Sequence, residues 1–155
     1  MADITIRKAN LDDLAILLEF EQAIIRFERP FAPNLRVDPI SYYDLASLIQ
    51  HEDAHVVVAE AVGEIIGSGY ALIKTNSAYK KPDQYVYLGF MYVKPSYRGQ
   101  GVNGLIIDHL ITWAQQQNLT ELQLDVYAEN EVALRAYKKK GFSSELLTMR
   151  LNLED

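Results

Sequence analysis

The chain has 155 residues, a length typical of one domain, and we expect a single domain over 1–155. Hydrophobic residues make up 49% of the chain and charged residues 23%, which excludes a disordered or collagen-like protein. Cysteine is absent, so a disulfide framework, a thiolate metal site and a cysteine nucleophile are excluded. Fifteen basic and 21 acidic residues give a net charge of −6, which argues against nucleic acid as a partner and mildly favours a cationic one.

We expect neither a targeting segment nor a membrane span. Residues 1–7 lack the basic and apolar regions of a secretory signal. The longest apolar stretch, 65–73, is interrupted by Gly67, Ser68 and Gly69, which excludes a spanning helix. With the absent thiols, these features predict a cytoplasmic protein.

The first 50 residues predict a strand and two helices. Ile4 and Ile6 alternate with polar residues, as in a short edge strand. Asn10 can cap a helix that ends at Pro30 and Pro33. Asp38-Pro39 opens a second helix, whose expected apolar positions are Ile40, Tyr43, Leu45, Leu48 and Ile49.

Three strands are expected next. Residues 55–61 and 65–75 form a hairpin around the turn Val62-Gly63-Glu64. Residues 84–93 are rich in aromatic strand formers, and Gly89 marks a possible bulge.

The C-terminal third predicts a helix over 101–117, closed by Asn118, and a strand over 122–126. A helix over 130–140, capped by Gly141, and a final strand over 146–151 follow. The expected order is β-α-α-β-β-β-α-β-α-β. We therefore predict an α/β fold with a mixed, mostly antiparallel sheet and helices on both faces.

The densest motif is Arg98-Gly99-Gln100-Gly101-Val102-Asn103-Gly104, between a strand and a helix. Glycines let backbone N–H groups approach an anion at a helix N-terminus, and Arg98 adds a cation, so we predict a phosphate site. The glycines also match the dinucleotide fingerprint, with Asp125 about 20 residues further on. Five residues separate Val93 from Gly99, and too few residues follow for a doubly wound sheet, which disfavours that alternative. No Lys-Ser or Lys-Thr follows the glycines, so a Walker motif is excluded.

The segment from Met91 through Tyr92, Val93 and Arg98 to Gly101 resembles the acetyl-CoA signature of the Gcn5-related N-acetyltransferases, Gln/Arg-x-x-Gly-x-Gly/Ala. The downstream Asn130, Ala133, Tyr137 and Gly141-Phe142 resemble that family's second motif. Asn103 stands where the family more often has Gly or Ala.

The resemblance implies acetyl-CoA as co-substrate and no metal. It places pantetheine against the strand containing Met91, Tyr92 and Val93, between this strand and residues 122–126. The pyrophosphate is expected on the loop residues, namely Arg98, Gly99, Gln100, Gly101, Val102, Asn103 and Gly104. Asn130 and Tyr137 are the remaining expected cofactor-binding residues.

The resemblance also makes Tyr137 the expected general acid, because a phenol carries its proton at neutral pH and can protonate the departing CoA thiolate. Relatives place a glutamate base on the strand before the loop, but Gly89 occupies that position here. Glu28, with Glu21 as alternative, is the candidate base. Each of these two glutamates could equally be a solvated helix charge.

His51-Glu52-Asp53-Ala54-His55 matches the metalloprotease pattern H-E-x-x-H. That site needs both histidines on one face of one helix. His55 leads directly into a strand-like run of valines, so we expect the match to be coincidental.

These observations predict an enzyme that transfers acetyl from acetyl-CoA to a primary amine of a small molecule or peptide in a ternary complex. Acidic Glu19, Glu21 and Glu28, with Tyr42 and Tyr43, could receive a cationic amine, or could be ordinary surface. The alternative function is a non-catalytic acyl-CoA-binding module. A homodimer is possible.

Overall fold

The computed structural model describes residues 3–154. Met1, Ala2 and Asp155 lie outside the described residues. The first two belong to residues 1–7, in which we expected no secretory signal. The main elements are β1 (Ile4–Lys8), α1 (Leu14–Glu28), α2 (Leu45–Gln50), β2 (Ala54–Ala61), β3 (Glu64–Thr75), β4 (Gln84–Val93), α3 (Val102–Gln116), β5 (Leu122–Gln123) and α4 (Glu131–Lys139). Short 3-10 turns, η1 (Leu11–Asp13), η2 (Arg29–Phe31) and η3 (Pro95–Tyr97), flank α1 and precede α3.

The chain forms two compact units, Met1–Asp125 and Val126–Asp155. The first contains the sheet and α1 to α3, and the second contains α4. That 1–155 is one domain stays a prediction. None of the helices within residues 3–154 combines the length and apolar character needed to cross a membrane.

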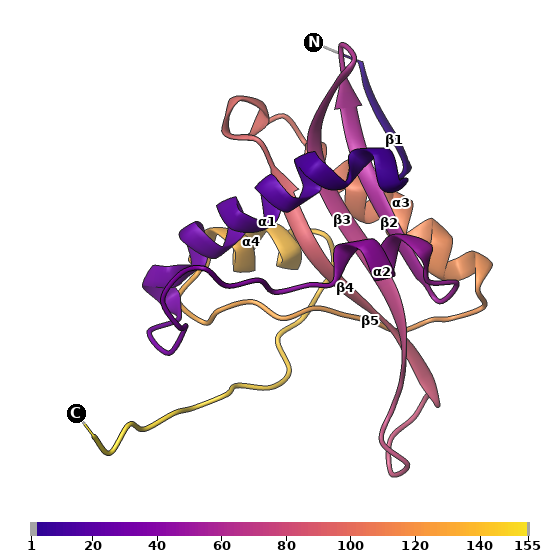
Figure 1. The fold of residues 1–155 in the computed structure, drawn as a ribbon. Helices are drawn as coiled ribbons and strands as arrows, with labels where there is room; N and C mark the ends of the chain where they lie inside the picture. The colour runs from indigo at the N-terminus through magenta and orange to yellow at the C-terminus, as the bar shows by residue number, and fades with distance from the viewer. Residues whose placement is uncertain (1–2, 155) are drawn as a thin grey trace. The chain divides into compact units, whose positions relative to one another are not determined.

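The sheet has the strand order β1-β2-β3-β4-β5, antiparallel up to β4, with β5 parallel to β4. Helices α1 and α2 cover one face and α3 covers the other (Figure 1). On the first face, Leu17 and Phe20 of α1 pack with Val56, Tyr70 and Phe90 of the sheet. The predicted α/β class, with a mostly antiparallel sheet and helices on both faces, is confirmed.

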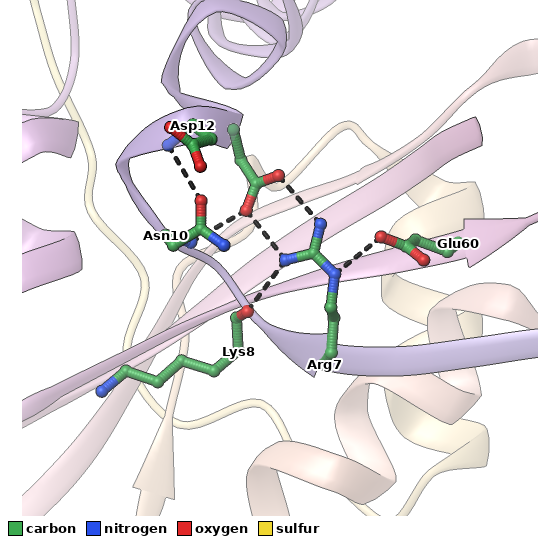
Figure 2. A network of polar contacts seen from close by, with 6 residues as sticks. Arg7, Lys8, Asn10, Asp12 and Glu60 are labelled. Atoms are coloured by element: carbon green, nitrogen blue, oxygen red, sulfur yellow. Dashed lines mark hydrogen bonds and ion pairs between the residues drawn. The ribbon is translucent and has the colours of Figure 1, made fainter. Parts of the chain in front are cut away.

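A polar network ties β1 to the start of α1 and to β2 (Figure 2). Both terminal nitrogens of Arg7 donate to Asp13 at 2.9 Å, and its Nε donates to Glu60 at 2.6 Å. Asn10 caps the helix as predicted, because its side chain accepts from Asp12 N–H while Asp13 accepts from Asn10 N–H. The Arg7 guanidinium lowers the pKa of the buried Asp13 carboxyl, so this carboxylate stays charged.

Three elements differ from the prediction. The strand β5 covers only Leu122–Gln123 of the expected 122–126. The helix α2 begins at Leu45, capped by Asp44, so Ile40 and Tyr43 lie outside it. The backbone N–H groups of Tyr42 and Tyr43 are instead held by the Glu21 carboxylate, which fixes this connection in a non-helical conformation.

The predicted final strand over 146–151 is wrong. Residues 142–152 have no regular secondary structure, and the segment runs extended to the C-terminus (Figure 1). A strand needs a neighbour for its backbone groups, and among the described residues this segment has no ladder partner. The element order therefore ends at α4.

Candidate active site

The strand β4 contains a β-bulge directly after Gly89. Tyr92 pairs with Ser68 and Gly89 pairs with Tyr70, so two residues of β4 oppose one residue of β3. Phe90, one of the two β4 residues that oppose Gly69, has a left-handed φ of +57°. Its carbonyl accepts a hydrogen bond at 3.0 Å from the hydroxyl of the fully buried Ser68. A bulge at this place confirms the expectation from Gly89.

Beyond the bulge, β4 presents backbone donors at the edge that faces away from β3. β4 and β5 pair only at Val86 and Tyr87. Lys94 N–H donates to Ile66 of β3 at 2.8 Å. Backbone groups alternate between the two neighbours of a strand, so the N–H groups of Val93 and Met91 point to the opposite edge. These are the two residues expected to bond pantetheine.

The loop after β4 leads into an uncapped helix N-terminus. Gly99 and Gly101 adopt left-handed φ values of +78° and +82°, and Gly101 is the N-cap of α3. No side chain caps this helix, and its first backbone bond runs from Leu105 N–H to Gly101 O. The N–H groups of 102–104 consequently have no partner within the helix, and the positive end of the helix dipole lies there. This arrangement suits an anion such as a pyrophosphate.

The space next to the Cα atom of Gly101 is open to a ligand. A Cβ built on this residue has no heavy atom within 4 Å, and the residue is exposed. The neighbouring Val102 is buried and anchors the helix start in the core. Gln100 is exposed, and Asn103 and Gly104 are half-buried in the first turns around this opening.

Arg98 folds back onto the end of β4. Its Nε donates to the Val93 carbonyl at 3.0 Å, and its guanidinium lies 5.9 Å from the centre of the Tyr92 ring. The Val93 carbonyl thus already accepts one hydrogen bond, and the N–H of this residue is its donor for a ligand. The residues expected around CoA from Met91 to Gly104 thus lie together in the first unit.

The structure explains why Gly89 replaces a carboxylate. An ideal Cβ on Gly89 would lie 2.6 Å from both Cζ and Oη of Tyr70, so the phenol of Tyr70 occupies the space directly above this glycine. Tyr70 lies opposite Gly89 in the β3–β4 register. A glycine across from a large aromatic residue is a recognised sheet pairing, but sequence reasoning missed it because the register was unknown.

Tyrosines surround this position. The Tyr43 ring contacts the rings of Tyr70 and Phe90 with centroids 5.6 and 5.3 Å apart, and the Tyr87 hydroxyl donates to Asp125 at 3.0 Å. Burial raises the pKa of the phenols of Tyr43, Tyr70 and Tyr87, so all three remain protonated at neutral pH. They can donate hydrogen bonds or face a cation, but they cannot accept a proton from an ammonium group.

The two candidate bases have different surroundings. Burial raises the pKa of the half-buried Glu28 carboxyl, an effect that the Tyr42 phenol partly offsets, and this carboxyl acts electrostatically on Tyr43. Glu21 is 1% exposed, so it is not a solvated helix charge. Its carboxylate accepts from the N–H groups of Tyr42 and Tyr43 at 3.0 and 2.8 Å, which indicates a structural role.

Asn130 and Tyr137 belong to the second unit. The Asn130 side chain caps α4 by accepting from Ala133 N–H at 3.3 Å. Gly141 closes the helix as predicted, with a φ of +107° and a bond from Phe142 N–H to Tyr137 O. The Tyr137 ring lies edge-on to the Phe142 ring at 5.9 Å. The roles expected for these two residues stay predictions.

The histidines of the H-E-x-x-H match lie in different elements, as expected: His51 ends α2 and His55 lies in β2. His55 Nε2 is 3.2 Å from Nε2 of His109 in α3, and the parallel rings have centroids 5.3 Å apart. These values fit a hydrogen bond between the two rings, in which the tautomers decide which nitrogen donates. Within residues 3–154, no cluster of three or more potential ligands could hold a metal ion.

Known proteins share this fold and sequence pattern. One relative, thialysine N-epsilon-acetyltransferase of Bos taurus, is 37% identical over 93 residues, which cover 56% of this chain and 54% of the relative. The matched part is thus about half of that protein.

A structure of a tetramutant of the BH1408 protein from Bacillus halodurans superposes with a TM-score of 0.85 at 22% identity, covering 96% of this chain and 99% of the other. A Clostridium acetobutylicum structure described as an acetyltransferase with acetyl-CoA gives a TM-score of 0.72 at 20% identity, covering 98% and 97%. The model of the Acetyltransferase (GNAT) family matches residues 21–142, which include the bulged strand, the loop and α4. The chain therefore belongs to the GNAT family of acetyltransferases.

Proposed function

We propose that this protein transfers the acetyl group of acetyl-CoA to a primary amine of a small molecule or peptide, by direct attack within a ternary complex. The observation that carries the proposal is the bulged end of β4 beside the uncapped start of α3. The first offers amide donors to an extended pantetheine arm, and the second offers N–H groups and a positive dipole end to a pyrophosphate. The residues present fit acetyl-CoA, which supplies the activated acetyl group.

In the proposed reaction, the amine nitrogen forms a bond to the acetyl carbonyl carbon and the carbon–sulfur bond breaks. The amine must first lose a proton, because an alkylammonium has no lone pair for attack. Glu28 is the proposed base: burial raises the pKa of its carboxyl, which makes the carboxylate a better proton acceptor. Tyr137 is the proposed acid that gives its proton to the CoA thiolate.

The proposed acceptor carries a positive charge. Tyr70 of β3 and Tyr43 of the segment before α2 place their rings in contact on the face of the sheet that α1 and α2 cover, and Glu28 acts electrostatically on Tyr43. Aromatic rings and a carboxylate together attract an ammonium group. The name of the bovine relative indicates acetylation of a side-chain amine, which supports the same substrate class.

The test is the release of free CoA. Because the chain has no cysteine, a thiol reagent detects only the product of the reaction. We expect turnover with a panel of polyamines, amino acids, aminoglycosides or N-terminal peptides. A protein that binds CoA but releases no thiol with any of these amines would be the non-catalytic acyl-CoA-binding module.

A matched pair of variants on α1 tests the base. We expect Glu28→Gln to lower kcat by about tenfold to a hundredfold and to remove the acidic limb of its pH profile. Glu19→Gln is the control, because Glu19 is exposed on the same helix. Equal effects of the two variants, or none, would argue against Glu28.

A further inference from the structure

The histidine pair between β2 and α3 has no part in the proposed reaction. His55 Nε2 lies 3.2 Å from His109 Nε2, and both residues are half-buried, so the pair is partly open to solvent. The His55 ring also lies parallel to the Trp113 ring, with centroids 5.4 Å apart. His55 is the second histidine of the H-E-x-x-H match, and its partner is His109 of α3 instead of the His51 that the motif supplies.

The distance between the two Nε2 atoms suits two ligands of one metal ion. A histidine nitrogen lies about 2.0–2.1 Å from Zn²⁺, and two such nitrogens at the tetrahedral angle are about 3.3–3.4 Å apart. The 3.2 Å between His55 Nε2 and His109 Nε2 is close to this span. Rotation of the two rings about their side-chain bonds can direct both lone pairs at one ion without moving either backbone.

The protons of the pair do not prevent this. A hydrogen bond between two ring nitrogens needs one N–H and one lone pair, so at least one of the two Nε2 atoms is unprotonated. A metal ion needs the lone pair of both, so the donor ring must carry its proton on Nδ1 instead. Among the described residues, neither His55 nor His109 has a hydrogen-bond partner at Nδ1 that opposes this change of tautomer.

Both histidines lie on rigid elements. His55 is in β2, which pairs with β1 on one side and with β3 on the other. His109 is in the middle of α3, where the neighbouring Ile106 and Leu110 are fully buried. The sheet and the core therefore hold the two nitrogens close together before any ion binds, which lowers the entropy cost of binding.

We propose that His55 and His109 form a binding site for a late divalent transition metal ion, with Zn²⁺ and Cu²⁺ as the expected ions. Imidazole suits both ions, and the affinity for Cu²⁺ should exceed that for Zn²⁺. Water completes the coordination, because residues 3–154 contain no cluster of three or more potential ligands. The ion would link α3 to the sheet, and the proposal does not depend on the acetyl-transfer activity.

The first test is calorimetric titration of the untagged protein with zinc chloride. We expect one ion to bind per chain, and His55→Gln and His109→Gln should each weaken the affinity at least tenfold, because each removes one of two protein ligands. His51→Gln is the matched control and should leave the affinity unchanged. His51 is exposed, and its Nδ1 accepts from Asp53 N–H at 3.0 Å.

Fluorescence gives a second, local measurement. Trp113 is the only tryptophan of the chain, and its ring lies beside His55. Cu²⁺ quenches a nearby indole, whereas Zn²⁺ has a filled d shell and no redox chemistry. One equivalent of Cu²⁺ should therefore quench the emission of Trp113, and excess Zn²⁺ should restore it. His109→Gln should abolish the quench at the same Cu²⁺ concentration.

Lys8 reports the position of the ion in variants that keep both histidines. Lys8 pairs with Val57, two residues from His55, so the three side chains lie on one face of the sheet. We expect Lys8→Glu to tighten Zn²⁺ binding at least tenfold at low salt, because it replaces a repelling charge by an attracting one. Lys80→Glu makes the same change in the exposed loop between β3 and β4 and should alter the affinity by less than about twofold.

Several results would overturn the proposed site. They are a wild-type protein that binds no Zn²⁺ at about 100 µM, zinc affinity that His51→Gln lowers as much as His55→Gln, and a Cu²⁺ quench that survives His109→Gln. Equal effects of Lys8→Glu and Lys80→Glu would also overturn it. The two histidines would then be a hydrogen-bonded pair with no ligand.

Discussion

Gly101→Ala is a direct test of the proposed pyrophosphate site. Gly101 has a φ of +82°, and a left-handed φ costs a residue with a Cβ about 1 kcal/mol. The new methyl group meets no heavy atom within 4 Å, so the free protein should lose only this amount of stability. If the pyrophosphate contacts Gly101 as proposed, the added methyl group occupies space that the ligand needs. Losing one charge-assisted hydrogen bond costs about 1.5–3 kcal/mol, which corresponds to about a tenfold to hundredfold weaker affinity.

The control is Gly63→Ala in the β2–β3 turn. Gly63 has a φ of +73° and equally open space around an added Cβ, so the strain on the backbone is matched. Chemical denaturation should show similar destabilisation of both variants, and calorimetry should show weaker CoA binding for Gly101→Ala alone. Unchanged CoA affinity in a folded Gly101→Ala variant, or equal losses in both variants, would refute the proposed site.

Three further predictions concern other parts of the molecule. Tyr137→Phe should lower kcat by about tenfold to a hundredfold and leave KM for acetyl-CoA nearly constant. If the variant keeps the full kcat under conditions where the chemical step limits the rate, Tyr137 is a packing residue and not the acid. Glu21→Leu leaves the backbone N–H groups of Tyr42 and Tyr43 without their acceptor. Denaturant titrations should show that it lowers the free energy of unfolding by about 2–4 kcal/mol. Glu21→Gln keeps an acceptor oxygen and should lower the free energy of unfolding by less. Burial, with lesser contributions from His109 and Lys8, lowers the pKa of His55 from 6.5 to about 4. The stability that His55 contributes is therefore complete above pH 6.5 and is lost as the pH falls toward 4, by about 1 kcal/mol once its partial exposure is allowed for. His55→Phe should flatten this part of the pH–stability curve, and an unchanged slope would contradict the assignment.

Local signals in the sequence determined most elements of this protein. The predicted strand over 84–93 matches β4, and the turn at Val62-Gly63 joins β2 and β3. The helix caps at Asn10 and Gly141 were also readable from the sequence. Capping and alternation depend on residues a few positions apart, so the chain itself contains the information. The glycine-rich loop and the family resemblance rest on equally local patterns.

Only the tertiary structure decided how distant residues meet. The β3–β4 register places Tyr70 over Gly89, and the packing of α1 buries Glu21 against the backbone of the segment before α2. These contacts join residues about 20 positions apart, and their identity depends on register and packing that no local pattern specifies. The segment 146–151 shows the same limit. Its alternation predicts a strand, but a strand forms only with a ladder partner, and the described residues contain none for this segment.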